Sequence, residues 1–313
     1  MADKPTMDEL FERRVSYPDF EPQGRLARLV GLDDQKDRLA KIIGLLVNPG
    51  RLDSWVKEHH PDASALLDTV LRRPPLVVMA GDVGSGKTEL AETIGDRVAR
   101  EEGIEITLFP LSLSTRGKGL VGEMTQLLAH AFDYTIAEGE RLKSSKGKTK
   151  GALILLVDEA DALAQSRESA QMHHEDRAGV NAFIRGIDRI ANGKLPVAVI
   201  MCTNRLGALD PAVRRRAADV LSFSRPNDEQ RRFVFNERLG ALGLAPKHIE
   251  ALVDATGPQG GAGSIGHTYS DLTQRVIPAI VLDAYPNKAV TGPRAVEVAK
   301  GLNPTPAFVD SQA

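Results

Sequence analysis

The sequence predicts an α/β protein: a doubly wound parallel sheet of five strands with helices on both faces, followed by a smaller all-helical domain. Five short runs are almost continuously apolar, which indicates strands that are buried on both faces, as in a parallel sheet covered by helices. Amphipathic segments of helical length separate these runs. After Pro226 no further strand-like run occurs. The five runs span residues 75–81, 104–112, 151–160, 196–204 and 219–226.

The segments before the first run predict an arm and two helical stretches. Residues 1–24 contain three prolines and no repeating apolar face, so we expect an N-terminal arm. Residues 25–47 predict a turn and then one amphipathic helix, with Asp33 or Asp34 as its N-cap. A second helical stretch is expected over 55–72.

The predicted large domain therefore spans residues 25–225, and the small helical domain spans 226–313. In the small domain the spacing of apolar residues predicts helices. These helices are expected at 227–243, 246–257 and 270–285.

Composition limits the possible partners and locations. Lys and Arg number 40 against 42 Asp and Glu, a formal net charge of -2, so no overall field draws the protein onto nucleic acid or an anionic membrane. The first thirty residues carry charge throughout, which predicts neither a signal peptide nor a membrane span. The cytoplasm is the expected location. The single cysteine, Cys202, lies in an apolar run and is expected to be buried.

The strongest chemical signal is GDVGSGKT, residues 81–88, which matches the pattern G-x-x-x-x-G-K-[ST] between a predicted strand and a predicted helix. Glycines let backbone N–H groups surround a phosphate, and the helix N-terminus adds positive potential. We expect Lys87 to reach the β- and γ-phosphates and the Thr88 hydroxyl to bind Mg²⁺. The candidate nucleotide-contacting residues of this motif are Asp82, Val83, Gly84, Ser85, Gly86, Lys87, Thr88 and Glu89.

Two further polar groups end predicted strands. Asp158 follows the run LILLV and is expected to hold Mg²⁺, while Glu159 beside it can accept the proton of an attacking water. A carboxylate pair is costly to bury unless a cation is present. Asn204 ends the next run and can orient that water. The Asp-Glu pair favours ATP hydrolysis, so ATP and Mg²⁺ are the predicted cofactors.

The order of these motifs resembles the AAA+ ATPases. The motifs are GDVGSGKT, LILLVDEAD, VIMCTN and LDPAVRRRAAD, followed by a helical segment. The resemblance covers almost everything from about Arg28 onward. It implies Mg-dependent ATP hydrolysis, a C-terminal helical lid, and a ring of identical subunits, usually a hexamer.

The resemblance also explains three adjacent arginines, 214–216, which repel one another and cannot lose their protons. In this family the segment places an arginine finger at the γ-phosphate held by a neighbouring subunit. Such a finger accelerates phosphoryl transfer by about 10³ to 10⁵. Matched from Asp210, the first candidate is Arg216 and the second is Arg215, with Arg214 at the surface or an interface.

Other family positions follow in the same way. Arg275 resembles the second sensor arginine, which bonds phosphate from the lid. Val30 and Gly31 resemble the segment that packs on adenine. The axial pore loop is implied at residues 114–124, where protein translocases usually carry an aromatic residue and this chain has Leu120 and Val121. The implied pore residues are Lys118, Gly119, Leu120 and Val121.

Finer features, RAGVNAFIRGIDRI, RRAAD and TQRVIPAIVLDAY, are similar to the pachytene-checkpoint ATPases. That resemblance implies a ring that engages a HORMA-domain partner through its pore loops and opens or disassembles it. The short N-terminal segment departs from eukaryotic members and implies a minimal bacterial version, found beside nucleotide-second-messenger defence systems. Two alternatives stay open: a nucleic-acid motor or loader, disfavoured by the near-neutral charge, and a non-motor ATP-dependent scaffold.

Overall fold

The computed structural model describes residues 10–113, 123–143, 149–163, 174–207, 209–260 and 264–307. The chain divides into two compact units. The first unit comprises Met1–Arg28, Asp34–Ala80 and Thr88–Ser222; the second comprises Leu29–Asp33, Gly81–Lys87 and Phe223–Ala313. The segment with the phosphate-binding pattern thus belongs largely to the same unit as the C-terminal helices. None of the helices in these ranges combines the length and apolar character needed to cross a membrane.

A six-stranded sheet forms the centre of the first unit, in the order β1-β3-β4-β5-β2-β6. The neighbours β3, β4, β5 and β2 pair in parallel, as the continuous apolar runs predict. The doubly wound α/β prediction is confirmed, but the predicted number of five strands is one too low. The strands are β1 (Val15–Tyr17), β2 (Leu76–Gly81), β3 (Ile106–Ser112), β4 (Ala152–Asp158), β5 (Val197–Thr203) and β6 (Ala217–Phe223).

The sixth strand, β1, comes from the segment expected to be an arm. It pairs antiparallel with β3 at the edge of the sheet. Its Tyr17 is 1% exposed, and the hydroxyl donates to the backbone carbonyl of Glu92 on α6. Helix α2 (Phe20–Ala27) follows, with the Asp19 carboxylate capping it at the N–H of Glu21. Three residues are too few to show strand alternation, so only pairing with β3 reveals this strand.

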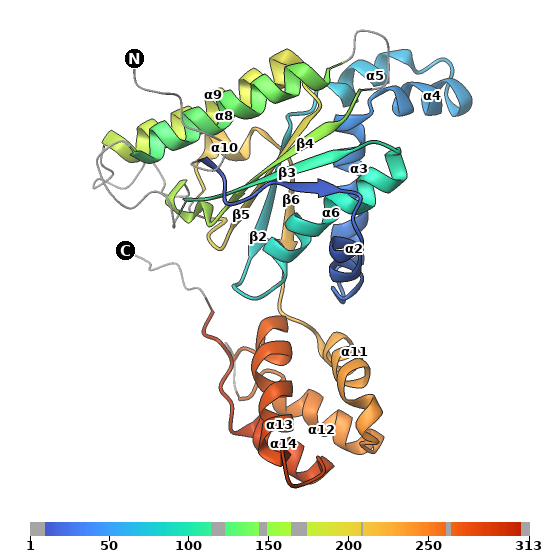
Figure 1. The fold of residues 1–313 in the computed structure, drawn as a ribbon, viewed down its shortest axis with the longest axis vertical. Helices are drawn as coiled ribbons and strands as arrows, with labels where there is room; N and C mark the ends of the chain where they lie inside the picture. Colours follow the sequence, from blue (N-terminus) through green and yellow to red (C-terminus); the bar gives the residue numbers. More distant parts are fainter. Residues whose placement is uncertain are drawn as a thin grey trace. The chain divides into compact units, whose positions relative to one another are not determined.

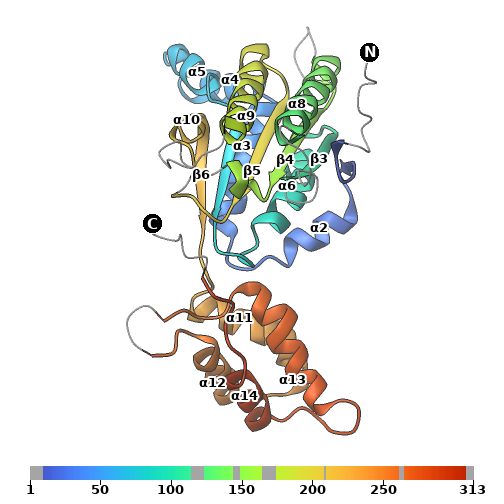
Figure 2. The same cartoon turned by 90° about the vertical axis from the view of Figure 1, so that its left-hand side faces the viewer.

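Helices cover both faces of the sheet: α8 and α9 lie on one face, and α3 and α6 lie on the other (Figures 1 and 2). The helical stretch expected over 55–72 consists of two helices, because Pro61 interrupts it. The remaining elements of this unit are α3 (Asp33–Val47), α4 (Gly50–His59), α5 (Ser64–Leu71), α6 (Lys87–Glu102), α8 (Glu123–Leu142), η1 (Ala160–Leu163), α9 (His174–Gly193) and α10 (Pro211–Arg214).

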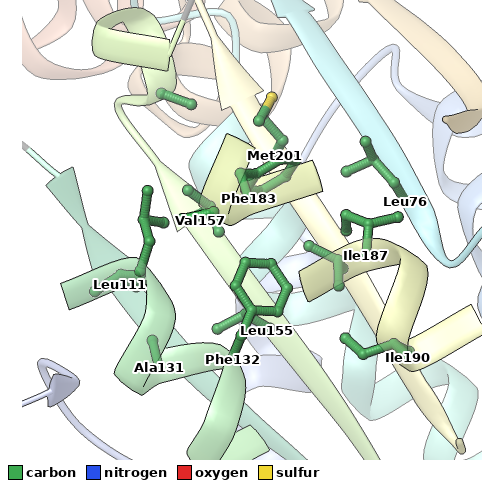
Figure 3. Close-up of a cluster of buried hydrophobic side chains, with 14 of the residues drawn as sticks. Leu76, Leu111, Ala131, Phe132, Leu155, Val157, Phe183, Ile187, Ile190 and Met201 are labelled. Atoms are coloured by element: carbon green, nitrogen blue, oxygen red, sulfur yellow. The ribbon is translucent and has the colours of Figure 1, made fainter. Parts of the chain in front are cut away.

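The core under α8 and α9 is mostly aliphatic, with several aromatic contacts. Phe132 of α8 and Phe183 of α9 meet edge to face, with ring centroids 5.5 Å apart, above side chains of the central strands (Figure 3). A Cβ at Gly186 would lie 2.3 Å from Cγ of Phe132. The two helices can therefore approach this closely only because α9 has a glycine there. Cys202 is buried, as expected.

The second unit is helical after β6, which confirms the predicted C-terminal helical domain. Its core gathers apolar side chains of α11, α12, η3, α13 and α14, with Phe235, Leu252 and Leu272 fully buried. The last helix was not predicted from the sequence, and the π-helical turn η3 and α13 were expected as one helix. The elements are α11 (Asp228–Leu239), η2 (Gly240–Leu242), α12 (Pro246–Thr256), η3 (Asp271–Val276), α13 (Ile277–Ala284) and α14 (Gly292–Lys300).

Candidate nucleotide site

The phosphate-loop segment joins β2 to α6. The Lys87 ammonium donates to the carbonyl oxygens of Gly81 at 2.7 Å and Asp82 at 2.8 Å, and the residue is only 7% exposed. Gly84 has φ +74°, and a Cβ there would lie 2.8 Å from Oγ1 of Thr268. Both the left-handed backbone and the close approach require glycine at this position. The loop thus curls around its lysine in the manner of a phosphate cradle.

The phosphate loop also contacts the segment that precedes η3. The N–H of Ser270 donates to the carbonyl oxygen of Gly84 at 3.1 Å. Three buried polar atoms on these contacting parts have no hydrogen-bond partner among the described residues: Ser85 Oγ, Tyr269 Oη and one terminal nitrogen of Arg225. Buried polar atoms normally form hydrogen bonds. Hydrogen-bonding groups without a protein partner beside the phosphate loop therefore fit the binding of a polar ligand such as a nucleotide.

Val30 and Gly31, the residues predicted to lie against adenine, belong to the same unit. Gly31 has φ +67°, and its carbonyl oxygen accepts from Nε2 of Gln230 at 3.1 Å. Val30 packs against the helical core. Tyr269 lies beside this segment, since a Cβ at Gly31 would be 2.6 Å from its hydroxyl. The sequence did not indicate Tyr269 as a site residue. Burial, with a smaller effect of the Asp33 charge, raises the pKa of Tyr269 to about 12, so its hydroxyl is a donor at neutral pH.

The carboxylate pair lies where β4 ends. The N–H of Glu159 donates to Oδ1 of Asp158 at 2.8 Å, and Glu159 has φ +52°, a left-handed conformation that is rare outside glycine. Glu159 is exposed and Asp158 half-buried. Strained backbone of this kind concentrates at functional sites. The parallel pairing of β4 with β5 brings Asp158 and Asn204 to the carboxyl ends of neighbouring strands.

Asp161, one turn beyond the pair, holds Asn204 in place. Its carboxylate accepts from the N–H of Asn204 at 2.8 Å, from the Asn204 side-chain amide at 3.0 Å and from the Thr203 hydroxyl at 2.7 Å. In the sequence Asp161 has only the signal of an acidic residue opening a helix, so its hydrogen bonds to Asn204 could not be predicted.

The arginine run begins in α10, whose N-cap is Asp210. Arg214 and Arg215 are exposed. Arg216 forms a two-pronged ion pair with Asp188 of α9, with nitrogen to oxygen distances of 2.7 and 2.9 Å. The hydrogen bond to Asp188 raises the pKa of the Arg216 guanidinium above its usual value. Within a single chain, therefore, the first finger candidate is engaged and the second faces solvent.

Two other predicted nucleotide contacts are engaged with protein groups. Glu89 accepts from Arg25 of α2 in two hydrogen bonds of 2.7 Å each. Arg275 donates to Asp271 at 2.7 Å and lies 3.4 Å from Oγ1 of Thr305. These contacts keep Arg275 beside other residues of the helical unit. Thr88 is exposed. The four predicted pore residues, 118–121, lie outside the described residues.

Known proteins with similar sequences and structures were compared with this chain. The family model described as "ATPase family associated with various cellular activities (AAA)" matches residues 77–225. CD-NTase-associated protein 6 of Escherichia coli strain MS 115-1 is 68% identical over 309 residues, which are 99% of both chains. A second protein of that name, from Escherichia coli strain KTE188, is 37% identical over 302 residues, covering 96% of this chain and 98% of the other.

A solved structure is also closely similar. It is described as the E. coli MS115-1 HORMA:CdnC:Trip13 complex, and one of its chains matches with a TM-score of 0.92 and 67% identity, over 98% of this chain and 100% of the other. The predicted fold, with its sheet and C-terminal helices, therefore agrees with an experimental fold over nearly the full length.

Proposed function

The chain belongs to the family of CD-NTase-associated protein 6, AAA ATPases of the Trip13 type, and we propose that it uses ATP to open or disassemble a HORMA-domain protein. The observation that carries this proposal is the close likeness to a chain of an assembly that contains HORMA, CdnC and Trip13 components. The likeness extends over both units and includes the edge of the sheet where the polar groups gather. We also propose that the protein is located in the cytoplasm.

We propose the following division of labour at the nucleotide. The loop 81–87 holds the phosphates with its N–H groups and Lys87, and the segment containing Val30 and Gly31 holds the base. Thr88 and Asp158 offer the hydroxyl and carboxylate oxygens that suit Mg²⁺, which when bound neutralises phosphate charge. Glu159 takes the proton of the attacking water, and Asn204, fixed by Asp161, orients that water.

We further propose that hydrolysis needs a neighbouring subunit. Arg216 or Arg215 then supplies the positive charge to the γ-phosphate of the neighbour. The ion pair of Arg216 with Asp188 does not exclude it, because its side chains are 32% and 45% exposed and such pairs contribute only about 0 to 1 kcal/mol. An assembly with this head-to-tail contact closes into a ring, which we propose to be a hexamer.

Residues 118–121 are proposed to grip the partner in the ring axis, and Arg275 to report the state of the nucleotide to the helical unit. For Arg275 this role requires an exchange of partners, since Asp271 now holds its guanidinium. The Arg275 side chain is 47% exposed, and Asp271, which is 1% exposed, keeps its hydrogen bonds from Thr268 and Thr305 after the exchange.

A trapping experiment tests the proposed function. Glu159→Gln keeps the loop and the Mg²⁺ groups but lacks the base, so it is expected to bind ATP and retain a HORMA-domain protein. Lys87→Ala, the matched control, is expected to lose both nucleotide and partner. Retained proteins are identified by mass spectrometry after pull-down with ATP. Retention of nucleic acid without a HORMA-domain protein contradicts the proposal and favours the nucleic-acid alternative.

A further inference from the structure

The segment 301–307, which follows α14, returns to the start of η3 and shares one carboxylate with Arg275. Thr305 donates through its backbone N–H to Oδ2 of Asp271 at 2.9 Å and through its hydroxyl to Oδ1 at 2.6 Å. Arg275 donates through Nη1 to the same Oδ1 at 2.7 Å. Asp271 and Thr305 are 34 residues apart in the sequence. The carboxylate therefore links the C-terminal segment to the arginine.

The shared carboxylate is buried, so it depends on these donors. Asp271 is 1% exposed, and its Oδ2 accepts a further hydrogen bond from the N–H of Thr268 at 3.0 Å. Each of the two oxygens thus accepts two hydrogen bonds from described residues, which uses the roughly four lone-pair sites of a carboxylate. A buried charge without such partners is strongly disfavoured.

The segment around Asp271 contacts the phosphate loop within the same compact unit. The N–H of Ser270, directly before Asp271, donates to the carbonyl oxygen of Gly84 at 3.1 Å. The N–H of Asp271 donates to the Thr268 hydroxyl at 3.0 Å, and a Cβ at Gly84 would lie 2.8 Å from that hydroxyl oxygen. The hydrogen bonds of Asp271 therefore hold a segment that touches the loop.

The four donors to Asp271 differ in their ability to leave. Three of them are groups of Thr268 and Thr305, whereas the fourth, Arg275, has a side chain that is 47% exposed. If Arg275 leaves, Oδ1 keeps the hydrogen bond from the Thr305 hydroxyl. Without that hydroxyl, Oδ1 would accept from none of the described residues, which is costly for a buried charge. The hydroxyl therefore stabilises Asp271 more when Arg275 is away than when it is present.

We propose that Thr305 is a positioning residue for Arg275, which keeps Asp271 hydrogen-bonded while the guanidinium exchanges this carboxylate for a phosphate of the nucleotide. The inference rests on the proposed role of Arg275 at the nucleotide. Thr305 itself does not contact the nucleotide in this exchange. The C-terminal segment thereby takes part in the response of the helical unit to ATP.

A first experiment tests the shared carboxylate without any nucleotide, through urea unfolding of the full chain. Thr305→Val removes the hydroxyl but keeps the N–H, and Arg275→Met removes the guanidinium but keeps an unbranched side chain. Thr305→Val is expected to lower the folding equilibrium constant of the helical unit at least about threefold more in the Arg275→Met background than in the unchanged chain. Equal losses in the two backgrounds overturn the inference.

A second experiment measures ATP affinity by titration calorimetry with Mg²⁺, in the Glu159→Gln background so that turnover plays no part. Thr305→Val is expected to weaken ATP binding about fivefold, because release of Arg275 from Asp271 becomes more costly. In the Arg275→Met background the same change is expected to alter ATP affinity by less than about twofold. A loss that persists without Arg275 overturns the inference.

Two further variants of threonine serve as controls. Thr305→Ser keeps the hydroxyl and is expected to match the unchanged chain in both experiments. Thr273→Val removes an exposed hydroxyl of η3 that donates to the carbonyl oxygen of Tyr269 at 2.8 Å, and it is also expected to change neither quantity. A loss of ATP affinity in Thr273→Val as large as that in Thr305→Val overturns the inference, since the effect is then not specific to Asp271.

The remaining outcomes separate this inference from the proposed function. If Thr305→Val does not fold, the hydroxyl is structural only and the inference fails. If Arg275→Met binds ATP as tightly as the unchanged chain, the nucleotide role of Arg275 fails, and the positioning role of Thr305 fails with it. Retention of a HORMA-domain protein by Glu159→Gln would still support the proposed function in either case.

Discussion

The Asp161 carboxylate holds Asn204 at two points, accepting from its backbone N–H at 2.8 Å and from its side-chain amide at 3.0 Å. This fixes the direction in which the Asn204 side-chain carbonyl oxygen points, since the amide nitrogen is already committed. A water-orienting side chain acts only when its own rotamer is held by neighbours. We therefore predict that Asp161 supports the proposed hydrolytic arrangement without touching the nucleotide.

Asp161→Ala is expected to lower kcat for ATP by up to about 100-fold while ADP affinity stays within about twofold, since a misplaced orienting group affects the reaction more than binding. Single-turnover hydrolysis together with ADP titration separates the two quantities. Asp133→Ala is the control: it removes an exposed carboxylate paired with Arg189 and should leave both unchanged. A parallel loss of ADP affinity and kcat in Asp161→Ala would indicate a folding role instead.

The two finger candidates differ within one chain, because Arg216 is paired with Asp188 and Arg215 is exposed to solvent. A variant of each residue distinguishes them. Arg215→Ala and Arg216→Ala should both bind ATP normally, and the variant that lacks the finger should hydrolyse about 1,000-fold more slowly. Mixing that variant with Lys87→Ala should restore part of the activity at mixed interfaces. Turnover per subunit that is independent of dilution, with no rescue in any mixture, would contradict a finger supplied by the neighbour.

Asp271 provides a pH-dependent test of the helical unit. Burial alone would raise the pKa of Asp271, but hydrogen bonds from Thr305 and Thr268, with Arg275, outweigh it and hold the pKa well below its usual value. Because the pKa is lower in the folded state than in the unfolded chain, the stabilisation is present above about pH 4 and is lost as the pH falls towards the folded value.

Asp271→Asn should lower the free energy of unfolding of the helical unit at pH 7 by about 3 kcal/mol, since the residue is 1% exposed and its partners lose their charged acceptor. Urea titrations followed by circular dichroism at pH 7 and pH 3.5 measure the change, and the difference from the unchanged protein should shrink at the lower pH. Asp283→Asn, at the exposed pair with Arg294, should have a much smaller effect. A difference that grows in acid would refute the assignment.

Gly31 tests the segment proposed to hold adenine. Its φ of +67° disfavours any other residue, and a Cβ would lie 2.2 Å from Nε2 of Gln230. Gly31→Ala should therefore weaken ADP binding by about tenfold, from roughly 1 to 2 kcal/mol of strain. Gly24→Ala is the control, because a Cβ at Gly24 in α2 has no neighbour within 4 Å. Unchanged ADP affinity in Gly31→Ala would show that this segment does not hold the nucleotide.

Most of the sheet could be predicted from the sequence because its signals are local. Each of the five predicted runs overlaps one of β2 to β6. The runs of β2 to β5 reflect burial of consecutive residues on both faces, whereas β6 is mostly half-buried. The helical stretch expected over 55–72 is helical but divided in two, since Pro61 interrupts it. Helix α14 was missed although Thr291 and Pro293 mark its start.

In the candidate site, too, residues with a local sequence signal could be predicted and residues without one could not. Lys87, Asp158 and Glu159 could be named as candidates because a loop motif and strand-terminal acids are contiguous in the chain. The contacts of Asp161, Tyr269 and Arg225 could not be predicted, since each involves a partner far away in the sequence; Arg225 and Asp82, for example, are 143 residues apart. Arg216 and Asp188 likewise meet only because α9 packs beside α10.

The amino-acid sequence by itself determined the strand-forming runs, the phosphate-binding pattern and the family, because these are properties of neighbouring residues in a fixed order. Only the tertiary structure decided which charges compensate one another, which side chain holds Asn204, and that residues 15–17 extend the sheet. Ion pairs and edge strands join common residue types across long stretches of chain, so that many pairings fit the same sequence and the packed fold selects among them.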